Sequence, residues 1–546
     1  MFTFPDRMKQ FLLFMAVICL YAGTQAQDRP LVVVGIVVDQ MSNEYLNRFN
    51  KDFGDDGFRK LMNGGTYFPN TYFNYVPTAT GPGHASIYSG SNPSGHGIVG
   101  NRWFDRKESA LTYCVSDRNT KGVNGESTVG QRSPTNLKGA AIGDMLKLSS
   151  SGKSKVYSLS IKDRSAILPG GYRADLALWW DDVSGKWTTS DYYVGKLPDW
   201  LDEFEKTNAA DNYLFTWNYD EGSNIDVDLK NHDAFEESFK GSEKTGFPHD
   251  LRALYEVEGF GVLKYSPFVN TYTFDLAKTM IRKSGLGTDY NPDIISISFS
   301  GTDYIGHRFG PYSEEIRDTY IRFDRDLGDF IRFLETEFGG DFVLFLTSDH
   351  GVMPNSEFLK STKIQSQRFD YKELKLQIKD QLKARYGSEN IFMSLVENQV
   401  YLNEEELKRL GLDVNSVEDF LADFLQGIVG LNVVLTAHDL MHKNYTRFPE
   451  VLIQNGFEKE RSGNLVFVLE PFTDDAEYTK GAGHGSPYEY DRHVPLIFYG
   501  RGITKGKCYY GNVDITQIAP SIADILKISR PPFCTSPSLT DIITTP

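Results

Sequence analysis

The sequence predicts an α/β protein whose central sheet is doubly wound, mostly parallel and flanked by helices. Four apolar runs are rich in β-branched residues and lack polar alternation, which is typical of strands buried on both faces. A helical stripe of apolar residues separates two of these runs, and strand, helix, strand is the crossover unit of a parallel sheet. The expected strands are Leu31–Val38, Pro292–Phe299, Phe342–Thr347 and Val494–Tyr499, and the expected helix is Ser313–Phe338.

The chain is long for one domain, but its organisation favours a single decorated unit. It has 546 residues, of which 40% are hydrophobic and 24% charged, a globular composition that excludes a disordered chain. No internal repeat or low-complexity linker divides it. The alternation of strands and helices is interrupted at approximately residues 179–271 and 357–472. We expect both stretches to be insertions over the active site of one α/β domain that spans residues 27–546.

Residues 1–26 are predicted to be a cleaved signal peptide. Arg7 and Lys9 precede the apolar run Phe11–Leu20, and Thr24 and Ala26 place small residues before a cleavage site. A membrane anchor would need a longer apolar run than this one. We therefore expect a periplasmic or secreted protein with no stable membrane anchor.

The formal charge excludes one broad class of partner. The chain carries −16, and removing the net +1 of residues 1–26 leaves −17. An acidic surface repels polyanions, so we expect no nucleic-acid binding and no binding to anionic membranes. A small phosphorylated substrate remains compatible, because metal ions and local cations reverse the potential inside a cleft.

Three cysteines follow the predicted signal peptide: Cys114, Cys508 and Cys534. In an oxidising compartment we expect a bridge between Cys508 and Cys534, whereas Cys114 has no obvious partner. The pattern indicates neither a thiol catalyst nor a cysteine zinc site.

Six candidate metal ligands lie close to the ends of the expected strands. Asp39 directly follows the first strand, and Asp303 and Asp349 closely follow the second and third. Residues just past the carboxyl ends of parallel strands gather in one crevice. An Asp-His pair alone is also compatible with an ordinary helix cap, but the joint positions favour a site for two divalent ions, with zinc the best match to mixed imidazole and carboxylate ligands. The candidates are Asp39, Asp303, His307, Asp349, His350 and His484.

Thr80 is the candidate nucleophile. It lies in a Gly/Pro turn that opens into a helix-like segment, where free N–H groups and the helix dipole favour a phosphate or an alkoxide. Metal coordination would lower the pKa of its hydroxyl. The alternative for Thr80 alone is a helix cap. Asn101 is a candidate amide donor to a phosphoryl oxygen, whereas we interpret His84 and His96 as structural.

Lys162 and Arg164 form a candidate basic pair. They follow an expected strand, Val156–Ile161, and residues two apart on a strand share a face. Two cations facing the metal site would match the extra charge that a phosphate monoester dianion carries over a diester. The alternative is a solvated turn.

With these residues in place, the chain resembles the alkaline phosphatase superfamily, most closely its phosphate-irrepressible, PafA-type members. The matching motifs run through nearly the whole chain in family order. They are PTATGPGH at Pro77–His84, GN at Gly100–Asn101, KDR at Lys162–Arg164, GTDYIGH at Gly301–His307, SDHG at Ser348–Gly351 and GAGHGS at Gly481–Ser486.

The resemblance implies an alkaline-phosphatase-like fold and an exported phosphomonoesterase that converts small-molecule phosphate monoesters into alcohol and inorganic phosphate. It implies two zinc ions per chain, one held by Asp303, His307 and His484, the other by Asp39, Asp349, His350 and Thr80. It also implies in-line attack by Thr80 through a phospho-threonine intermediate, with Asn101, Lys162 and Arg164 binding the non-bridging oxygens. Lys162 would take the place of a third, magnesium ion, so no Mg2+ site is expected.

Several other functions remain open. A nucleotide pyrophosphatase/phosphodiesterase of the same superfamily would share the metals and the threonine, and the pair Lys162 and Arg164 argues against it. A sulfatase would need a Cys/Ser-x-Pro-x-Arg motif, and a cytosolic mutase fits poorly with the signal segment. A secreted non-catalytic binding protein is a remote alternative, because every expected catalytic position is filled. The sequence leaves the oligomeric state open, a monomer included.

Overall fold

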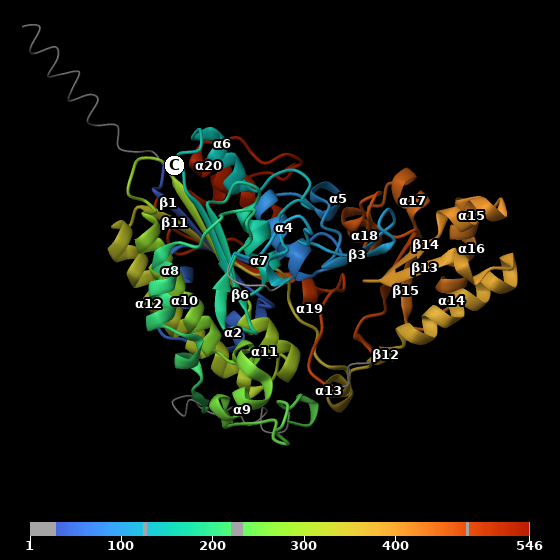
Figure 1. Ribbon diagram of the computed structural model, residues 1–546, viewed down its shortest axis with the longest axis horizontal. Coiled ribbons are helices and arrows are strands. Elements are labelled where there is room, and N and C mark those ends of the chain that lie inside the picture. Colours follow the sequence, from blue (N-terminus) through green and yellow to red (C-terminus); the bar gives the residue numbers. More distant parts are fainter. Residues whose placement is uncertain (1–28, 124–127, 220–232, 477–479, 545–546) are drawn as a thin grey trace, which may run out of the picture.

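The computed structural model describes residues 29–123, 128–219, 233–476 and 480–544 (Figure 1). The predicted signal peptide, residues 1–26, lies outside the described residues. None of the described helices is both long and apolar enough to cross a membrane.

A ten-stranded sheet forms the centre of the molecule, and its strands run in the order β19-β2-β18-β11-β1-β10-β5-β6-β7, with β20 also paired to β2. The neighbours of the central strand β1 lie parallel to it, as do β5 and β6 further along the sheet. The predicted mostly parallel sheet is therefore confirmed. The strands are β1 (Val32–Val38), β2 (Thr66–Tyr72), β5 (Val156–Ser160), β6 (Leu176–Asp181), β7 (Lys186–Thr188), β10 (Asp293–Phe299), β11 (Phe342–Thr347), β18 (His493–Gly500), β19 (Lys507–Cys508) and β20 (Val513–Asp514).

Helices cover both faces of the sheet, which explains why its central strands lack polar alternation. In β1 every residue is buried, and alternate side chains enter two different cores. Val34 and Ile36 pack with α10 and α12, whereas Val33 and Val37 pack with α4, α6 and α20 on the opposite face (Figure 1). These helices are α4 (Thr80–Ser89), α6 (Ile142–Ser149), α10 (Phe268–Ser284), α12 (Glu314–Phe338) and α20 (Ile518–Leu526).

The direction of β18 differs from the simplest expectation. This strand, predicted from Val494–Tyr499, is antiparallel to β11, with Thr347 opposite Leu496. Its start therefore lies at the edge of the sheet where β11 ends. This is why His484, which precedes β18 in the sequence, reaches the same edge as residues that follow the parallel strands.

The segment predicted as a first insertion begins inside the central sheet. Trp179 lies in β6, which pairs with β5 and with the short strand β7. The chain then forms α8 (Asp199–Thr207), α9 (Leu251–Glu258) and a 3-10 helix at Gly259–Tyr265 before α10. Side chains from these elements join the core that covers one face of the sheet, so the segment packs against the sheet as well as extending from it.

Residues from the second predicted insertion build a separate small sheet with its own core. Its strands run in the order β13-β14-β16-β15, and three helices, α14, α15 and α16, pack on it. We call these elements the outer unit; Figure 1 shows it in orange, beside the central sheet. The bounds are β13 (Phe392–Val396), β14 (Gln399–Leu402), β15 (Leu431–Thr436), β16 (Leu465–Leu469), α14 (Tyr371–Tyr386), α15 (Glu404–Leu410) and α16 (Val414–Gln426).

A two-stranded sheet lies beside the outer unit, with β12 (Gln367–Phe369) parallel to β17 (Thr473–Asp475).

The expected bridge between Cys508 and Cys534 is not formed. Cys508 is exposed in the edge strand β19, Cys534 packs beside Gly90, and both are free thiols, as is the buried Cys114. The prediction was wrong because two cysteines that are close in the sequence need not lie on elements that face each other.

Candidate active site

The predicted ligands meet at one edge of the central sheet. Asp39 follows β1 directly, and Asp349 and His350 follow β11. Asp303 lies within α11 (Gly301–Phe309), the helix that begins two residues after β10, and His484 comes from the glycine-rich loop before β18. The topology thus gathers residues that are up to 445 positions apart in the sequence.

Two overlapping groups of side chains have the geometry of metal sites. Asp39, Asp349 and His350 offer atoms within 4.8 Å of one another, and so do Asp303, His350 and His484. His307 also reaches the second group, because its Nε2 lies 3.2 Å from Oδ1 of Asp303. His350 lies between the two groups, with its ring stacked on that of His484 at a centroid distance of 3.6 Å.

The three candidate histidine ligands are held in the same way. In each ring Nδ1–H donates to a backbone carbonyl, that of Ala482 for His307 at 2.7 Å and that of Thr78 for His484 at 2.8 Å. The corresponding bond of His350 goes to Gly351 at 2.9 Å. A hydrogen bond at Nδ1 leaves Nε2 with its lone pair directed at the site, the usual arrangement of histidine ligands.

The carboxylates have unsatisfied capacity that fits cations. Asp39 and Asp349 are fully buried, yet Oδ1 of Asp39 and Oδ2 of Asp349 form no hydrogen bond to a described residue. Oδ2 of Asp349 has longer ion-pair contacts, at 3.3 Å from Nδ1 of His84 and 3.6 Å from Nε2 of His350. Buried carboxylate oxygens are normally paired, so the donor set fits divalent metal ions that would complete it.

Lys162 joins the two groups of carboxylates. Its Nζ donates to Asp39 at 2.8 Å and to Asp303 at 2.5 Å, and the side chain is almost fully buried. The predicted strand ends at Ser160, and Lys162 is the N-cap residue of α7 (Asp163–Gly170). The prediction that Lys162 and Arg164 share a strand face was therefore wrong, although the strand-to-helix turn still directs both side chains to the site.

The pKa directions follow from this crowding of charges. Burial and the neighbouring Asp349 raise the pKa of Asp39 well above its usual value. Burial also acts to raise the pKa of Asp303, but His307 and Lys162 outweigh it and lower that pKa well below the usual value. Burial lowers the pKa of His484, so its imidazole is neutral and able to act as a ligand.

Thr80 is the first residue of α4, and its side chain points to the same place. Its Oγ1 lies 3.3 Å from Nη2 of Arg164 and 3.4 Å from Nε2 of His350. The threonine is only 1% exposed, so its hydroxyl is presented to the site and not to bulk water. Its position at a helix N-terminus adds the positive end of the helix dipole.

Asn101 and Arg164 both lie close to the start of α4, where this hydroxyl is. The side-chain oxygen of Asn101 accepts the backbone N–H of Gly81 at 2.8 Å, which fixes the amide beside the start of α4. Arg164 donates through Nη1 to the hydroxyl of Tyr113 at 3.2 Å, and that hydroxyl donates to Asp163. Both donors are therefore oriented by further hydrogen bonds.

His84 and His96 make hydrogen bonds within the fold. His84 donates through Nδ1 to the carbonyl of Thr80 at 2.9 Å, and its Nε2 lies 2.8 Å from the hydroxyl of Ser298. His96 is fully buried against Ser86, and burial lowers its pKa to about 3. These contacts support the interpretation of both residues as structural.

Two residues that bear on the site carry no signal in the sequence. Gln40 donates through Nε2 to Asp303 at 2.8 Å and through its backbone N–H to Asp349 at 3.1 Å, with φ at 65°. Glu397 comes from the outer unit and accepts the backbone N–H groups of Asn101 and Arg102. A glutamine after an aspartate and a glutamate in a hairpin turn are common, so only the spatial arrangement identifies them.

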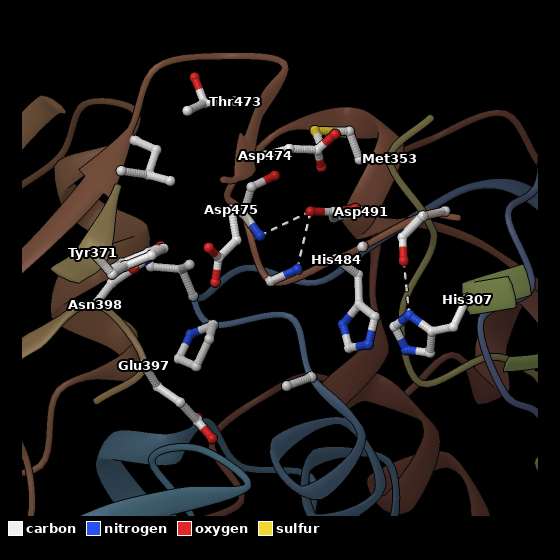
Figure 2. Close-up of a pocket in the computed structure, with 18 of the residues that line it drawn as sticks. His307, Met353, Tyr371, Glu397, Asn398, Thr473, Asp474, Asp475, His484 and Asp491 are labelled. Carbon is white, nitrogen blue, oxygen red and sulfur yellow. Dashed lines mark hydrogen bonds between the residues drawn. The ribbon is translucent and has the colours of Figure 1, made fainter. Parts of the chain in front are cut away.

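A cavity of about 820 Å³ opens in front of these residues. Its lining includes His307, His484 and Asn101, together with Tyr371 and Leu395 from the outer unit. Figure 2 shows the loop of His484 held by Asp491, whose carboxylate accepts the N–H groups of residues 485 and 486 at 3.0 and 2.8 Å. The space is far larger than one phosphate group needs, so a sizeable organic group fits beside it.

Comparison with known proteins matches residues 33–487 to the family described as type I phosphodiesterase / nucleotide pyrophosphatase. A Myroides odoratus protein described as a calcium-transporting ATPase is 37% identical over 93% of this chain and 94% of its own length. Alkaline phosphatase PafA of Elizabethkingia meningoseptica is 35% identical over 98% of this chain and 99% of its own. A crystal structure of wild-type alkaline phosphatase PafA superimposes with a TM-score of 0.86 and 34% identity, covering 94% of this chain and 99% of the other.

Proposed function

The chain belongs to the type I phosphodiesterase / nucleotide pyrophosphatase family, among the PafA-type members of the alkaline phosphatase superfamily, and from this premise we propose that it is a zinc-dependent phosphomonoesterase. The resemblance predicted from the motifs is thereby confirmed. The observation that carries the activity is the meeting of Thr80, Arg164 and Lys162 with the buried Asp/His cluster.

The buried donor set supports two divalent ions, which we propose to be zinc. Asp303, His307 and His484 would hold one ion, and Asp39, Asp349 and His350 would hold the other together with Thr80. When bound, the two ions would supply positive charge that lowers the pKa of the Thr80 hydroxyl and stabilises negative charge on the leaving oxygen. Nζ of Lys162 contacts both Asp39 and Asp303, so we expect no third, magnesium ion there.

Three side chains would bind the phosphoryl group. Arg164 already lies within 3.3 Å of Thr80 Oγ1 and presents a fork that matches two oxygens. Lys162 would add a point charge, and the NH2 group of Asn101 would donate to a third oxygen. All three donors are held before substrate arrives, which is the requirement for electrostatic stabilisation of a transition state.

In the first chemical step, Oγ of Thr80 would attack phosphorus in line with the leaving oxygen. The Thr80 hydroxyl loses its proton and its Oγ1–P bond forms as the P–O bond to the alcohol breaks. The electron pair leaves with the alcohol oxygen, which takes up one proton, so the protons balance. Water then attacks the phosphorus of phospho-Thr80, which restores the threonine hydroxyl and releases inorganic phosphate. Burial of Thr80 limits competing attack by bulk water.

The basic pair favours monoesters over diesters. A monoester dianion carries one more charge than a diester, and the buried side chain of Lys162 together with Arg164 supplies cations to match it. The same pair suits the terminal phosphoryl group of a nucleotide, which agrees with the name of the Myroides odoratus relative. The family description also covers diesterases, so diester hydrolysis is the second candidate activity.

We further propose that the protein is exported and acts on small-molecule phosphate esters. The net charge of −16 and the amino-terminal pattern at residues 1–26 support this. Since the described contacts concern the phosphoryl group, we expect a broad range of leaving groups.

The test is hydrolysis of matched mono- and diester substrates by the zinc-loaded protein, with metal content measured on the same sample. Thr80→Ala should lower monoester turnover by at least about 10³-fold with most of the zinc retained. Lys162→Ala combined with Arg164→Ala should reduce monoester hydrolysis much more than diester hydrolysis. Unchanged turnover in Thr80→Ala would refute the nucleophile, and equal losses on both substrates would remove the preference for monoesters.

A further inference from the structure

One hairpin turn of the outer unit contacts the chain segment that carries Asn101. β13 and β14 pair antiparallel, with Val396 opposite Gln399, so Glu397 and Asn398 are the two turn residues. Both have positive φ, 47° and 60°, the backbone of a tight two-residue hairpin in which glycine or asparagine is usual. A glutamate in this conformation is unfavourable unless its side chain makes a compensating contact.

That contact is with the chain segment of Asn101. The two carboxylate oxygens of Glu397 accept the backbone N–H groups of Asn101 at 3.0 Å and of Arg102 at 2.8 Å. The partners are 296 and 295 positions apart in the sequence. Glu397 lies between β13 and β14, whereas Asn101 directly precedes the strand Arg102–Asp105 of another sheet. Hydrogen bonds to an ionised acceptor are about twice as strong as neutral ones, so this is a firm attachment.

Gly100, the residue before Asn101, leaves space for the carboxylate of Glu397. A side chain at Gly100 would place its Cβ 1.9 Å from Oε2 of Glu397, so glycine leaves the space that the carboxylate occupies. The backbone of Gly100 does not have positive φ, and its lack of a side chain is explained by this close approach. Figure 2 shows Glu397 and Asn398 at the wall of the cavity opposite His307 and His484.

The orientation of Asn101 makes the attachment relevant to chemistry. Its side-chain oxygen accepts the N–H of Gly81, the residue after Thr80. The NH2 end of the amide is therefore the end available to a phosphoryl oxygen at Thr80. A shift of the Asn101 backbone would move this donor, and displacements of about 1 Å at a reacting site cost up to about 100-fold in rate.

We propose that Glu397 is a positioning residue through which the outer unit holds Asn101 in place for the phosphoryl group. The role rests on the proposed function, because it assigns Asn101 to the phosphoryl oxygens. Arg102 and Arg164 are the charged groups that act on Glu397, and burial raises the pKa of the carboxyl to about 7. Above that pH the carboxylate is largely ionised, as a firm acceptor of two N–H groups should be.

A purely structural role predicts a different pattern from a positioning role, and a double-mutant cycle separates them. Glu397→Ala should lower kcat/KM for a phosphate monoester by about 10- to 100-fold, in the range found when a supporting residue of a site is removed. In the Asn101→Ala background the same change should cost less than about 3-fold, because the group it positions is absent. Equal fold losses in the two backgrounds, or no loss in the wild-type background, would overturn the proposal.

A second variant changes the same contact from the other side. Gly100→Ala places a methyl group against the flexible end of Glu397, so it should displace the carboxylate while the chain still folds. It should reproduce the loss of Glu397→Ala, and combining the two changes should add little. The matched control is Glu389→Ala, which should leave kcat/KM unchanged. Glu389 lies in the 3-10 helix directly before β13 and pairs with Lys383.

Affinity for inorganic phosphate distinguishes failure of this proposal from failure of the proposed function. Wild-type protein that binds phosphate but does not hydrolyse monoesters would refute the phosphomonoesterase assignment alone. The cycle would then be read from phosphate affinity, which Glu397→Ala should weaken at least about tenfold only when Asn101 is present. An unchanged affinity would overturn the role of Glu397 in that case too.

Discussion

At the carboxyl edge of the central sheet, charged side chains are buried against one another, whereas in the outer unit polar side chains are satisfied locally. Lys162 and the fully buried Asp39 and Asp349 lie at the edge, and two of the carboxylate oxygens form no hydrogen bond to a described residue. In the outer unit, Asp370, Asn403 and Asp413 each cap the start of a helix by accepting backbone N–H groups.

The difference separates two uses of polar residues. A cap completes the hydrogen bonds of its own helix and stabilises the fold without any ligand. The cluster at the sheet edge is incomplete on its own, since buried charge without a full set of partners is costly. The edge is therefore arranged for ligands that bring positive charge, and the outer unit is arranged for stability, with Glu397 as its contribution to the site.

The largest expected effect comes from removing the cation of the buried cluster. Lys162→Met leaves Asp39 and Asp303 without their shared partner and should lower the free energy of unfolding of the metal-free protein by about 3–5 kcal/mol. Urea unfolding followed by tryptophan fluorescence would measure this change. Lys147→Met is the control, because its 2.7 Å pair with Asp175 is partly exposed and should be worth no more than about 1 kcal/mol.

The same unfolding measurement in the presence of zinc tests whether the buried cluster binds metal ions. Ions that bind only the folded protein stabilise it by mass action, so excess zinc should raise stability in wild type far above that of a chelated sample. If Lys162→Met were no more destabilising than Lys147→Met without metal, the buried carboxylates would not need the charge of Lys162. That result would contradict the difference drawn between the sheet edge and the outer unit.

The second effect tests whether the outer unit has a core of its own. Leu421 in α16 is fully buried among the apolar side chains of that unit, and Leu421→Ala should cost about 2–5 kcal/mol. Because Leu421 packs in the core of the outer unit and not in the cores of the central sheet, kcat/KM of the folded fraction should change by less than about 3-fold. Leu327→Ala in α12 is the counterpart in the core of the central sheet, with a similar cost.

Thermal unfolding monitored by circular dichroism, with activity measured well below the transition, gives both quantities. A large loss of activity in Leu421→Ala at a temperature where the protein is folded would show that the two cores act as one.

The sequence was informative where the chain obeys a period or a fixed motif. The buried strands β1, β10 and β11 and the helix α12 lie within one or two residues of their predicted ranges, because burial on both faces imposes apolar runs. The candidate ligands meet because a parallel sheet collects the residues at its carboxyl edge.

The sequence was uninformative where an arrangement depends on tertiary contacts. The antiparallel direction of β18 leaves no local trace, since a buried strand has the same composition in either direction. The contribution of Glu397 depends on a hairpin turn that meets Asn101 across 296 positions, and a single glutamate carries no pattern. Lys162 and Arg164 do not share the predicted strand face, because a helix begins at Asp163.

A third effect is the pH dependence of stability that comes from a carboxyl group in the two-stranded sheet beside the outer unit. Asp474 in β17 accepts the N–H of Ser356 at 2.7 Å, and burial raises its pKa from 3.8 to about 6. A carboxyl whose folded pKa is raised stabilises the fold fully below its unfolded pKa, and this stabilisation is lost as pH rises through about 6. Relative to Asp474→Asn, wild type should therefore lose about 2 kcal/mol between pH 4 and pH 7.

Chemical denaturation at several pH values on both proteins would give this difference. A difference that is constant with pH, or that grows more favourable to wild type as pH rises, would contradict the raised pKa of Asp474.

The smallest effect tests a cap of the outer unit directly. Asp370 accepts the N–H groups of Lys372 and Glu373 at 2.9 and 3.0 Å at the start of α14, and Asp370→Ala should lower the free energy of unfolding by about 1 kcal/mol. Asp370→Asn keeps an acceptor and should recover most of that loss. Neither change should alter kcat/KM or zinc content, because the cap completes only its own helix. A loss of activity in Asp370→Ala that Asp370→Asn restores would mean that the position of α14 also determines the cavity wall at Tyr371. The helix α14 would then contribute to ligand binding as well as to the stability of the outer unit.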